Sequence, residues 1–281
     1  MKDTADDLRA EYRELAGLCR SLTPAQWRLK SDFYGWTPWD EVAHLCYFDE
    51  TATLSATDAE AFARDTAVLA TGREMSAVAR EKYGHLDGAA LLAHWEPIAM
   101  RLTDLLAALD PKARLPWYGP SMSARSFASA RLMETWAHGQ DVWDVVGRER
   151  AGTPRLKHIA HIGVTTFGWS FVNRKLPVPA VVPFISLDAP GGEVWHWGDP
   201  ASPEFVRGSA LDFCLLVTQR RNLADTGLRY SNGSAREWLS IAGPQASIID
   251  FMAASTFCAR ALNASLMTSS IGPISPGVRS N

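Results

Sequence analysis

Cysteine is scarce in this sequence and forms no recognisable site. The 281 residues include four cysteines, Cys19, Cys46, Cys214 and Cys258, and no two of them form a C-x-x-C pair. This spacing argues against a cysteine zinc site and against the disulfide framework of a small secreted protein. Each cysteine has apolar neighbours in the sequence, so we expect buried, reduced thiols.

The sequence also lacks long apolar runs and long basic runs. No apolar run reaches the ~20 residues that span a membrane, and the N-terminal stretch has no apolar signal core. The net charge is −3, with −6 in residues 1–150 and +3 in residues 151–281. We therefore expect a cytoplasmic protein with two differing parts, which binds neither nucleic acid nor membranes.

Helical periodicity dominates the first 150 residues. Thr37 is a predicted N-cap, followed by Pro38 in the first turn and by Asp40, whose carboxylate favours a helix start. Gly147 is a predicted C-terminal stop. We predict long helices over residues 3–22, 38–55, 86–109 and 123–146, and a helical insertion or lid over 58–82.

The sequence after residue 150 predicts a smaller mixed unit. Prolines and glycines separate short stretches of strand character, and an apolar helix precedes Arg220 and Arg221. We predict helices over residues 153–174, 209–221 and 236–241, and strands over 178–187, 193–197, 204–207 and 228–230. Residues 243–281 hold few charges and end in a Ser-, Pro- and Gly-rich stretch, which predicts partial disorder.

Two residues of the helix predicted over 123–146 suit a metal ion. Glu134 and His138 lie four residues apart and project from one face. Many helices contain this pair by chance, so a third ligand is needed. His44 lies on or beside the apolar stripe of the second helix, where a structural role is the commoner one. His158 and His161, three residues apart without a nearby carboxylate, favour a core or surface role.

Tryptophan is abundant near these residues. Trp36, Trp39, Trp136 and Trp143 lie close to them in the sequence. This clustering suits an aromatic-walled pocket and suits a tightly packed core equally well.

Two stretches resemble the motifs of a known family. They are Gly35-Trp-Thr-Pro-Trp-Asp-Glu-Val-Ala-His44-Leu and Glu134-Thr-Trp-Ala-His138-Gly-Gln-Asp-Val, and they resemble the mycothiol-dependent maleylpyruvate isomerases, which have a DinB-like metal-binding bundle. Residues 155–242 resemble the C-terminal part of an actinobacterial subgroup. The resemblance implies a mixed α and α/β chain: a DinB-like four-helix bundle at 1–150, a small α+β, sterol-carrier-protein-like domain at 151–242, and an atypical tail at 243–281.

The resemblance also implies a site. His44, Glu134 and His138 would hold a divalent metal, zinc by the family's example, with an open position for a ligand. Arg220, with Arg221 as second candidate, would bind the substrate or the thiol. We expect Asp141 or Asp144 either to orient a metal ligand or to be a solvated acid at the helix end.

Three hypotheses for the function follow. The first is an isomerase or S-transferase that activates a low-molecular-weight thiol, mycothiol by resemblance, for attack on a small electrophile. The second is a non-catalytic metal- or small-ligand-binding protein of the same fold. The third is a paralogue that keeps the fold alone and binds no metal; the presence of both histidines and the glutamate counts against it.

Overall fold

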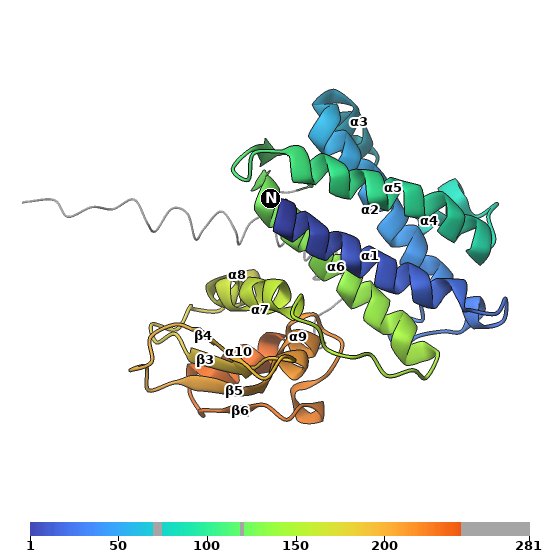
Figure 1. Cartoon of the computed structure of the whole chain (residues 1–281). Coiled ribbons are helices and arrows are strands. Elements are labelled where there is room, and N and C mark those ends of the chain that lie inside the picture. Colours follow the sequence, from blue (N-terminus) through green and yellow to red (C-terminus); the bar gives the residue numbers. More distant parts are fainter. Residues whose placement is uncertain (70–74, 119–120, 243–281) are drawn as a thin grey trace, which may run out of the picture.

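Four long helices pack against one another in the first half of the chain (Figure 1). The computed structural model describes residues 1–69, 75–118 and 121–242. The first and second helices each pack on the third and fourth. These four helices are α1 (Lys2–Arg20), α2 (Pro38–Thr57), α5 (Gly88–Ala108) and α6 (Ala124–Val145). Their positions agree with the predicted ones to within two residues at each end.

The start of α2 is fixed as its sequence predicts. The Thr37 hydroxyl accepts from the Asp40 amide at 3.3 Å, and the Asp40 carboxylate accepts from the Thr37 amide at 2.9 Å, which completes a capping box. Arg80 donates to the other Asp40 oxygen at 2.9 Å. The first turn is therefore held from two sides, and Glu41 and His44 follow directly from it.

The segment predicted as a helical insertion or lid contains two helices in its described part, α3 (Ala59–Leu69) and α4 (Met75–Tyr83). A short 3₁₀ turn, η1 (Gln26–Arg28), lies earlier in the chain, between α1 and α2. Phe62 of α3 stacks on Trp117 with ring centroids 5.8 Å apart. Asp65 accepts from the hydroxyls of Tyr47 and Tyr118. These contacts hold α3 on the bundle.

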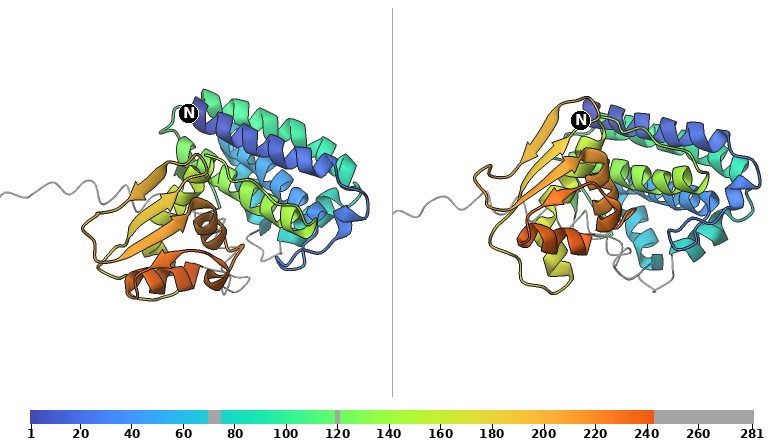
Figure 2. Two further views of the ribbon diagram at one scale, coloured as in Figure 1. Left: turned by 60° about the horizontal axis from the view of Figure 1, so that its bottom comes forward. Right: turned by 90° about the horizontal axis from the view of Figure 1, so that it is seen from below.

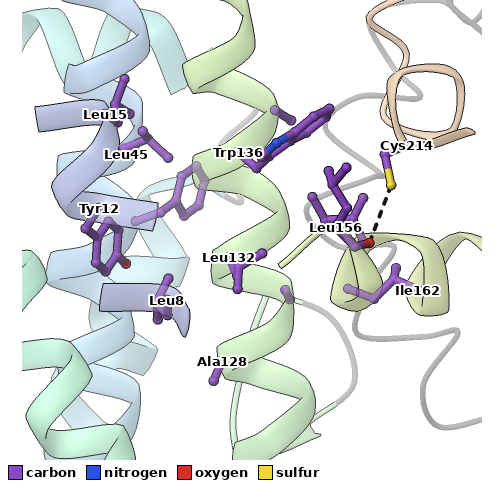
Figure 3. Packing of buried hydrophobic residues seen from close by; sticks show 14 of the residues in the cluster. Leu8, Tyr12, Leu15, Leu45, Ala128, Leu132, Trp136, Leu156, Ile162 and Cys214 are labelled. Atoms are coloured by element: carbon purple, nitrogen blue, oxygen red, sulfur yellow. Dashed lines mark hydrogen bonds between the residues drawn. The ribbon is translucent and has the colours of Figure 1, made fainter. Parts of the chain in front are cut away.

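The bundle and the second half share one continuous hydrophobic core. Figure 3 shows Leu8, Tyr12 and Leu132 inside the bundle, with Leu156 and Cys214 beyond α6. The Cys214 thiol donates to the Leu156 carbonyl at 3.5 Å. Because α7 (Leu156–Thr165) packs both on α6 and on α9 (Ala210–Val217), it connects the two halves (Figure 2).

The second half combines a four-stranded sheet with short helices. The sheet order is β4-β3-β5-β6, in which β3 and β5 are parallel and the other pairs antiparallel. The elements are α7 (Leu156–Thr165), α8 (Phe167–Asn173), β3 (Phe184–Asp188), β4 (Val194–Trp197), β5 (Phe205–Ser209), α9 (Ala210–Val217), η2 (Leu223–Asp225), β6 (Arg229–Tyr230) and α10 (Ser234–Ala242); a two-stranded ribbon, β1 (Arg114–Leu115) and β2 (Met122–Ser123), precedes α6.

Some boundaries differ from the prediction. The helix predicted over 153–174 is broken at Thr166, whose φ of −92° and ψ of 6° leave the helical region. The strand predicted over 178–187 begins only after Pro183, as β3, because prolines cannot donate to a sheet ladder. The predicted tail, with Cys258, lies outside the described residues. Among those described, no helix has the length and apolar character to cross a membrane.

Candidate functional site

The two predicted metal-binding segments face each other inside the bundle. His44 lies on α2, and Glu134 and His138 lie on α6. The Nε2 atoms of both histidines lie 3.5 Å from the same oxygen, Glu134 Oε2. The two imidazole rings are 4.2 Å apart between centroids. All three side chains are buried, with His138 fully inaccessible. Residues 90 positions apart in sequence thus form one three-donor cluster.

The spacing of these donors fits a metal ion. Ligand atoms about 2.0–2.1 Å from a tetrahedral zinc ion lie roughly 3.3–3.4 Å from one another. The observed 3.5 Å between each Nε2 and Oε2 is close to that value, and it is long for a charge-assisted hydrogen bond, which is about 2.7–2.9 Å. Two imidazoles and one carboxylate are also the donor types of an open catalytic zinc site.

The protonation states of the cluster fit a cation as well. Burial lowers the pKa of His44, and burial together with repulsion from His44 lowers the pKa of His138 well below its usual value. Burial acts to raise the pKa of Glu134, but the interactions with the two histidine rings outweigh it and hold that pKa well below the usual range. The site therefore offers neutral imidazoles and an ionised carboxylate, the forms in which these groups bind metals.

The formal charge around the cluster is −2. Three buried carboxylates, Glu41, Glu134 and Asp141, lie near the buried guanidinium of Arg220, and the second buried guanidinium nearby, Arg131, is neutralised by its pair with Asp49. Burial raises the pKa values of Glu41 and Asp141, since neither carboxylate is fully compensated in the protein alone. A divalent cation would bring the sum to zero.

Glu41, and not Asp141 or Asp144, contacts a histidine of the cluster. Glu41 Oε2 lies 2.7 Å from His138 Nδ1. Asp141 instead accepts from Arg220, and Asp144 accepts from Arg221. Neither predicted acid therefore hydrogen-bonds a histidine of the cluster: Asp141 is buried in its pair with Arg220, and Asp144 pairs with Arg221 nearer the surface. The sequence motif contains Glu41 but predicted no role for it, although its position three residues before His44 places both on one face of α2.

The arginines of the second half reach the bundle at different depths. The end of α9 is a Schellman motif, with the Arg220 amide bonded to the Leu215 carbonyl and Gln219 at a φ of +64°. This turn directs Arg220 to Asp141, and the Arg220 guanidinium carbon lies 4.4 Å from the Phe33 ring centroid. Arg221 pairs with Asp144 at the surface. Both predicted arginines thus join the two halves of the molecule, and Arg220 lies closer to the three-donor cluster.

Aromatic side chains of the loop before α2 border the cluster. The Trp36 ring is stacked on His138 at 5.9 Å and lies 5.4 Å from His44. Phe33 lies edge-on to His138 at 5.6 Å. Trp36 thus packs against both histidines, whereas Trp39 donates to the Leu86 carbonyl and Trp136 packs under Arg150.

Two cavities meet at Arg220. A small cavity of about 70 Å³ lies between α6 and the second half, with Glu134, Arg174 and Arg220 among its lining residues. An open cleft of about 980 Å³ lies on the other side of Arg220 and is lined by polar residues such as Ser31, Asp144 and Asn222. A cavity therefore lies against Glu134, the carboxylate of the three-donor cluster.

Other titratable clusters are structural. His158 contacts Asp7 and Ser129, and His161 accepts from the Trp197 indole, so this pair does not converge on one point. A second group, Cys46, Glu50 and His94, lies within metal-binding distance. However, Lys82 already pairs with Glu50, and burial raises the Cys46 pKa to about 12, which disfavours the thiolate that a metal needs.

Comparison with known proteins gives relatives for most of the chain. Residues 8–143 match the family model described as the mycothiol maleylpyruvate isomerase N-terminal domain. Two Mycobacterium tuberculosis proteins, the uncharacterized proteins MT0041 of strain CDC 1551 / Oshkosh and Rv0036c of strain ATCC 25618 / H37Rv, are each 40% identical over 237 residues. The alignment covers 84% of this chain and 92% of each relative.

Solved structures with the same fold carry the family's name. A crystal structure of the mycothiol-dependent maleylpyruvate isomerase aligns with a TM-score of 0.54 at 16% identity. That of a histidine-to-alanine mutant aligns with 0.53 at 15%. Each alignment covers 82% of this chain and 92% of the other. As its two motifs predict, the chain belongs to the family of the mycothiol maleylpyruvate isomerase N-terminal domain.

Proposed function

We propose that the protein is a thiol-dependent enzyme, an isomerase or S-transferase acting on a small electrophile, with a divalent metal, zinc, held by His44, Glu134 and His138. The observation that carries this proposal is the convergence of both Nε2 atoms on one Glu134 oxygen at 3.5 Å. The buried formal charge of −2 around these donors supports a divalent ion.

The metal would supply one kind of chemistry. When bound, it lowers the pKa of a coordinated thiol, so that a thiolate nucleophile is present at neutral pH. The family and the solved structures carry mycothiol in their names, and mycothiol is accordingly the thiol that we propose for this chain. The three cysteines among the described residues do not suit that role, because burial raises the pKa of Cys19 and Cys46 to about 12 and raises that of Cys214 as well.

The protein's side chains would shape the reaction around that thiolate. Trp36 and Phe33 cover the two histidines and exclude water from them. The cavity beside Glu134 would hold the electrophile, and Arg220 in its wall would steady a carboxylate or polar group. Arg221 is the weaker candidate, since it is bound to Asp144 at the surface.

The geometry favours an enzyme over a non-catalytic binding module. Within the described residues, the metal-binding group that unites His44, Glu134 and His138 has three members, which leaves a position for a fourth ligand. A structural zinc site has four protein ligands and no cavity. The small cavity has Glu134 in its wall, so there is open space beside one of the three proposed ligands, as a catalytic site with an open position needs.

The finer fold assignment is part of the same proposal. We place a DinB-like four-helix bundle at residues 1–150 and a sterol-carrier-protein-like α+β domain at 151–242. The packing of α1, α2, α5 and α6 supports the first, and the small mixed sheet supports the second. The tail at 243–281 lies outside the described residues.

Elemental analysis and thiol titration test the function. We expect zinc near one per chain in the purified protein, and its loss in His44→Ala and His138→Ala with the helical circular dichroism retained. His158→Ala, outside the cluster, serves as the matched control. Titration of the cobalt-substituted protein with mycothiol should then shift the visible spectrum. Full zinc occupancy in both cluster variants would exclude the site, and an unchanged spectrum would exclude thiol coordination.

A further inference from the structure

A fully buried glutamate, Glu41, lies against the side of the His138 ring that faces away from Glu134. Glu41 is in the first turn of α2, three residues before His44, and its side chain is 1% exposed. Glu41 Oε2 lies 2.7 Å from Nδ1 of His138, while Nε2 of the same ring lies 3.5 Å from Glu134. The two nitrogens of His138 therefore face two different carboxylates, one from each helix.

Burial of a carboxylate at this position needs a compensating role. The neighbouring core positions of α2, Val42 and Leu45, are apolar and inaccessible. An apolar residue at position 41 would avoid the desolvation of a charge, which is among the most expensive changes in a protein interior. The contact of Glu41 with His138 Nδ1 is at charge-assisted hydrogen-bond length. Glu41 thus has a specific partner in the metal cluster.

The two other acids near His138 have other partners. Both oxygens of Asp141 accept from Arg220, at 2.7 to 3.3 Å. Asp144 accepts from Arg221 and from Gln140. The carboxylates of Asp141 and Asp144 are therefore taken up by other donors, whereas the Glu41 carboxylate contacts an imidazole directly.

We propose that Glu41 is the positioning residue of the metal centre, which fixes the orientation and tautomer of His138. As acceptor of the Nδ1–H, the Glu41 carboxylate leaves the lone pair of Nε2 directed at the point shared with Glu134 and His44. Its negative charge also favours a divalent cation at that point. This inference rests on the proposed function, since it concerns the same metal. In this proposal Glu41 is not a metal ligand itself and acts through the histidine.

Two substitutions at position 41 separate orientation from charge. Glu41→Gln keeps an oxygen that can accept the Nδ1–H but removes the negative charge. Glu41→Ala removes both. Because loss of such a partner weakens metal binding by about 10- to 100-fold, we expect the zinc dissociation constant to rise by about that factor in Glu41→Ala and by less in Glu41→Gln.

Glu50→Gln is the matched control. It makes the same change on the same helix, but Glu50 pairs with Lys82 and His94 and contacts none of the three metal-binding residues. Zinc affinity is measured by competition with a chromophoric chelator, and ligand orientation by the visible spectrum of the cobalt form. Thermal unfolding of each metal-free variant tells whether it folds; if Glu41→Ala does not, Glu41→Gln decides.

The outcomes separate this inference from the function itself. A rise in the zinc dissociation constant in the folded variants, with an altered cobalt spectrum and an unchanged Glu50→Gln protein, supports the positioning role. Dissociation constants within twofold of wild type in the folded position-41 variants overturn it and leave the proposed metal site standing. Absence of zinc binding by the wild-type chain overturns the proposed function and this inference together.

Discussion

Arg220 and Asp141 form a buried ion pair that joins the two halves of the molecule. Nη2 of Arg220 donates to Oδ2 of Asp141 at 2.7 Å, and both side chains are almost inaccessible, at 3% and 7% exposure. The neighbouring pair, Arg221 with Asp144, joins the same segments, but its side chains are 36% and 34% exposed. Two consecutive arginines thus make similar contacts in different dielectric surroundings.

Substitution of the two arginines should have unequal effects. Arg220→Ala leaves a carboxylate buried without its partner, which typically destabilises by about 3–5 kcal/mol. Arg221→Ala removes an exposed pair, worth about 0–1 kcal/mol. Urea unfolding of the metal-free variants measures the difference. Thiol-dependent turnover should also fall in Arg220→Ala alone. Equal losses of stability would show that burial does not distinguish the two pairs.

Asp49 should be the most sensitive polar residue of the bundle. Its carboxylate accepts from Tyr12 of α1, Trp95 of α5 and Arg131 of α6, and so links all four long helices. Asp49→Asn leaves the buried Arg131 without a counter-ion, and we expect a loss of about 3–5 kcal/mol in the free energy of unfolding.

Two variants calibrate that measurement. Tyr12→Phe removes one hydrogen bond to Asp49 and should cost about 1 kcal/mol. Asp104→Asn breaks the Arg9 pair at the surface, where Asp104 is 69% exposed, and should change little. If Asp49→Asn unfolds at the same urea concentration as Asp104→Asn, the central role of Asp49 is wrong.

Zinc affinity should increase with pH. In the metal-free protein, burial and repulsion from Asp141 raise the pKa of Glu41, and burial raises that of Asp141. A cation favours the ionised carboxylates, so its binding releases protons. Below the raised pKa values of the metal-free protein, we expect the zinc dissociation constant to fall as the pH rises, by up to about tenfold per pH unit for each proton released. Chelator competition at pH 5.5, 6.5 and 7.5 measures this slope.

Glu41 and Asp141 should make the stability of the metal-free protein fall as the pH rises, whereas zinc affinity rises. A raised folded-state pKa gives stability that is fully present below the unfolded pKa and is lost as the pH rises through the folded value. Zinc should therefore raise the melting temperature more at pH 7.5 than at pH 5.5. A thermal shift independent of pH would contradict the proton release inferred for Glu41 and Asp141.

The cysteines of the described chain should be unreactive in the native protein. Burial raises the pKa values of Cys19 and Cys46 to about 12, and raises that of Cys214 as well. With 5,5′-dithiobis(2-nitrobenzoate) at pH 8, we expect no modification of these three until denaturant is added, because the thiolate is the reactive form. Peptide mapping by mass spectrometry reports each cysteine separately, Cys258 included. Rapid native labelling of Cys46 would contradict its burial.

Local signals in the sequence predicted the long helices well. The Thr37–Asp40 capping box lies where its pattern places it, and Gly147 adopts a φ of +68° after α6. These features depend on residues within one turn of each other, so local stereochemistry determines them. The break at Thr166 was missed because the apolar pattern continues from α7 into α8 without a proline. There the packing of each short helix decides the boundary.

The sequence by itself determined that Glu134 and His138 share a helix face, since a separation of four residues sets this in any α-helix. It also carried the two motifs that place the chain in its family. Only the tertiary structure decided that His44 meets them, that Glu41 backs His138, and that Arg220 reaches Asp141 from the other half of the molecule. Those contacts join residues 79 to 97 positions apart. Helix packing and the turn after α9 set them, because no local propensity specifies which faces meet.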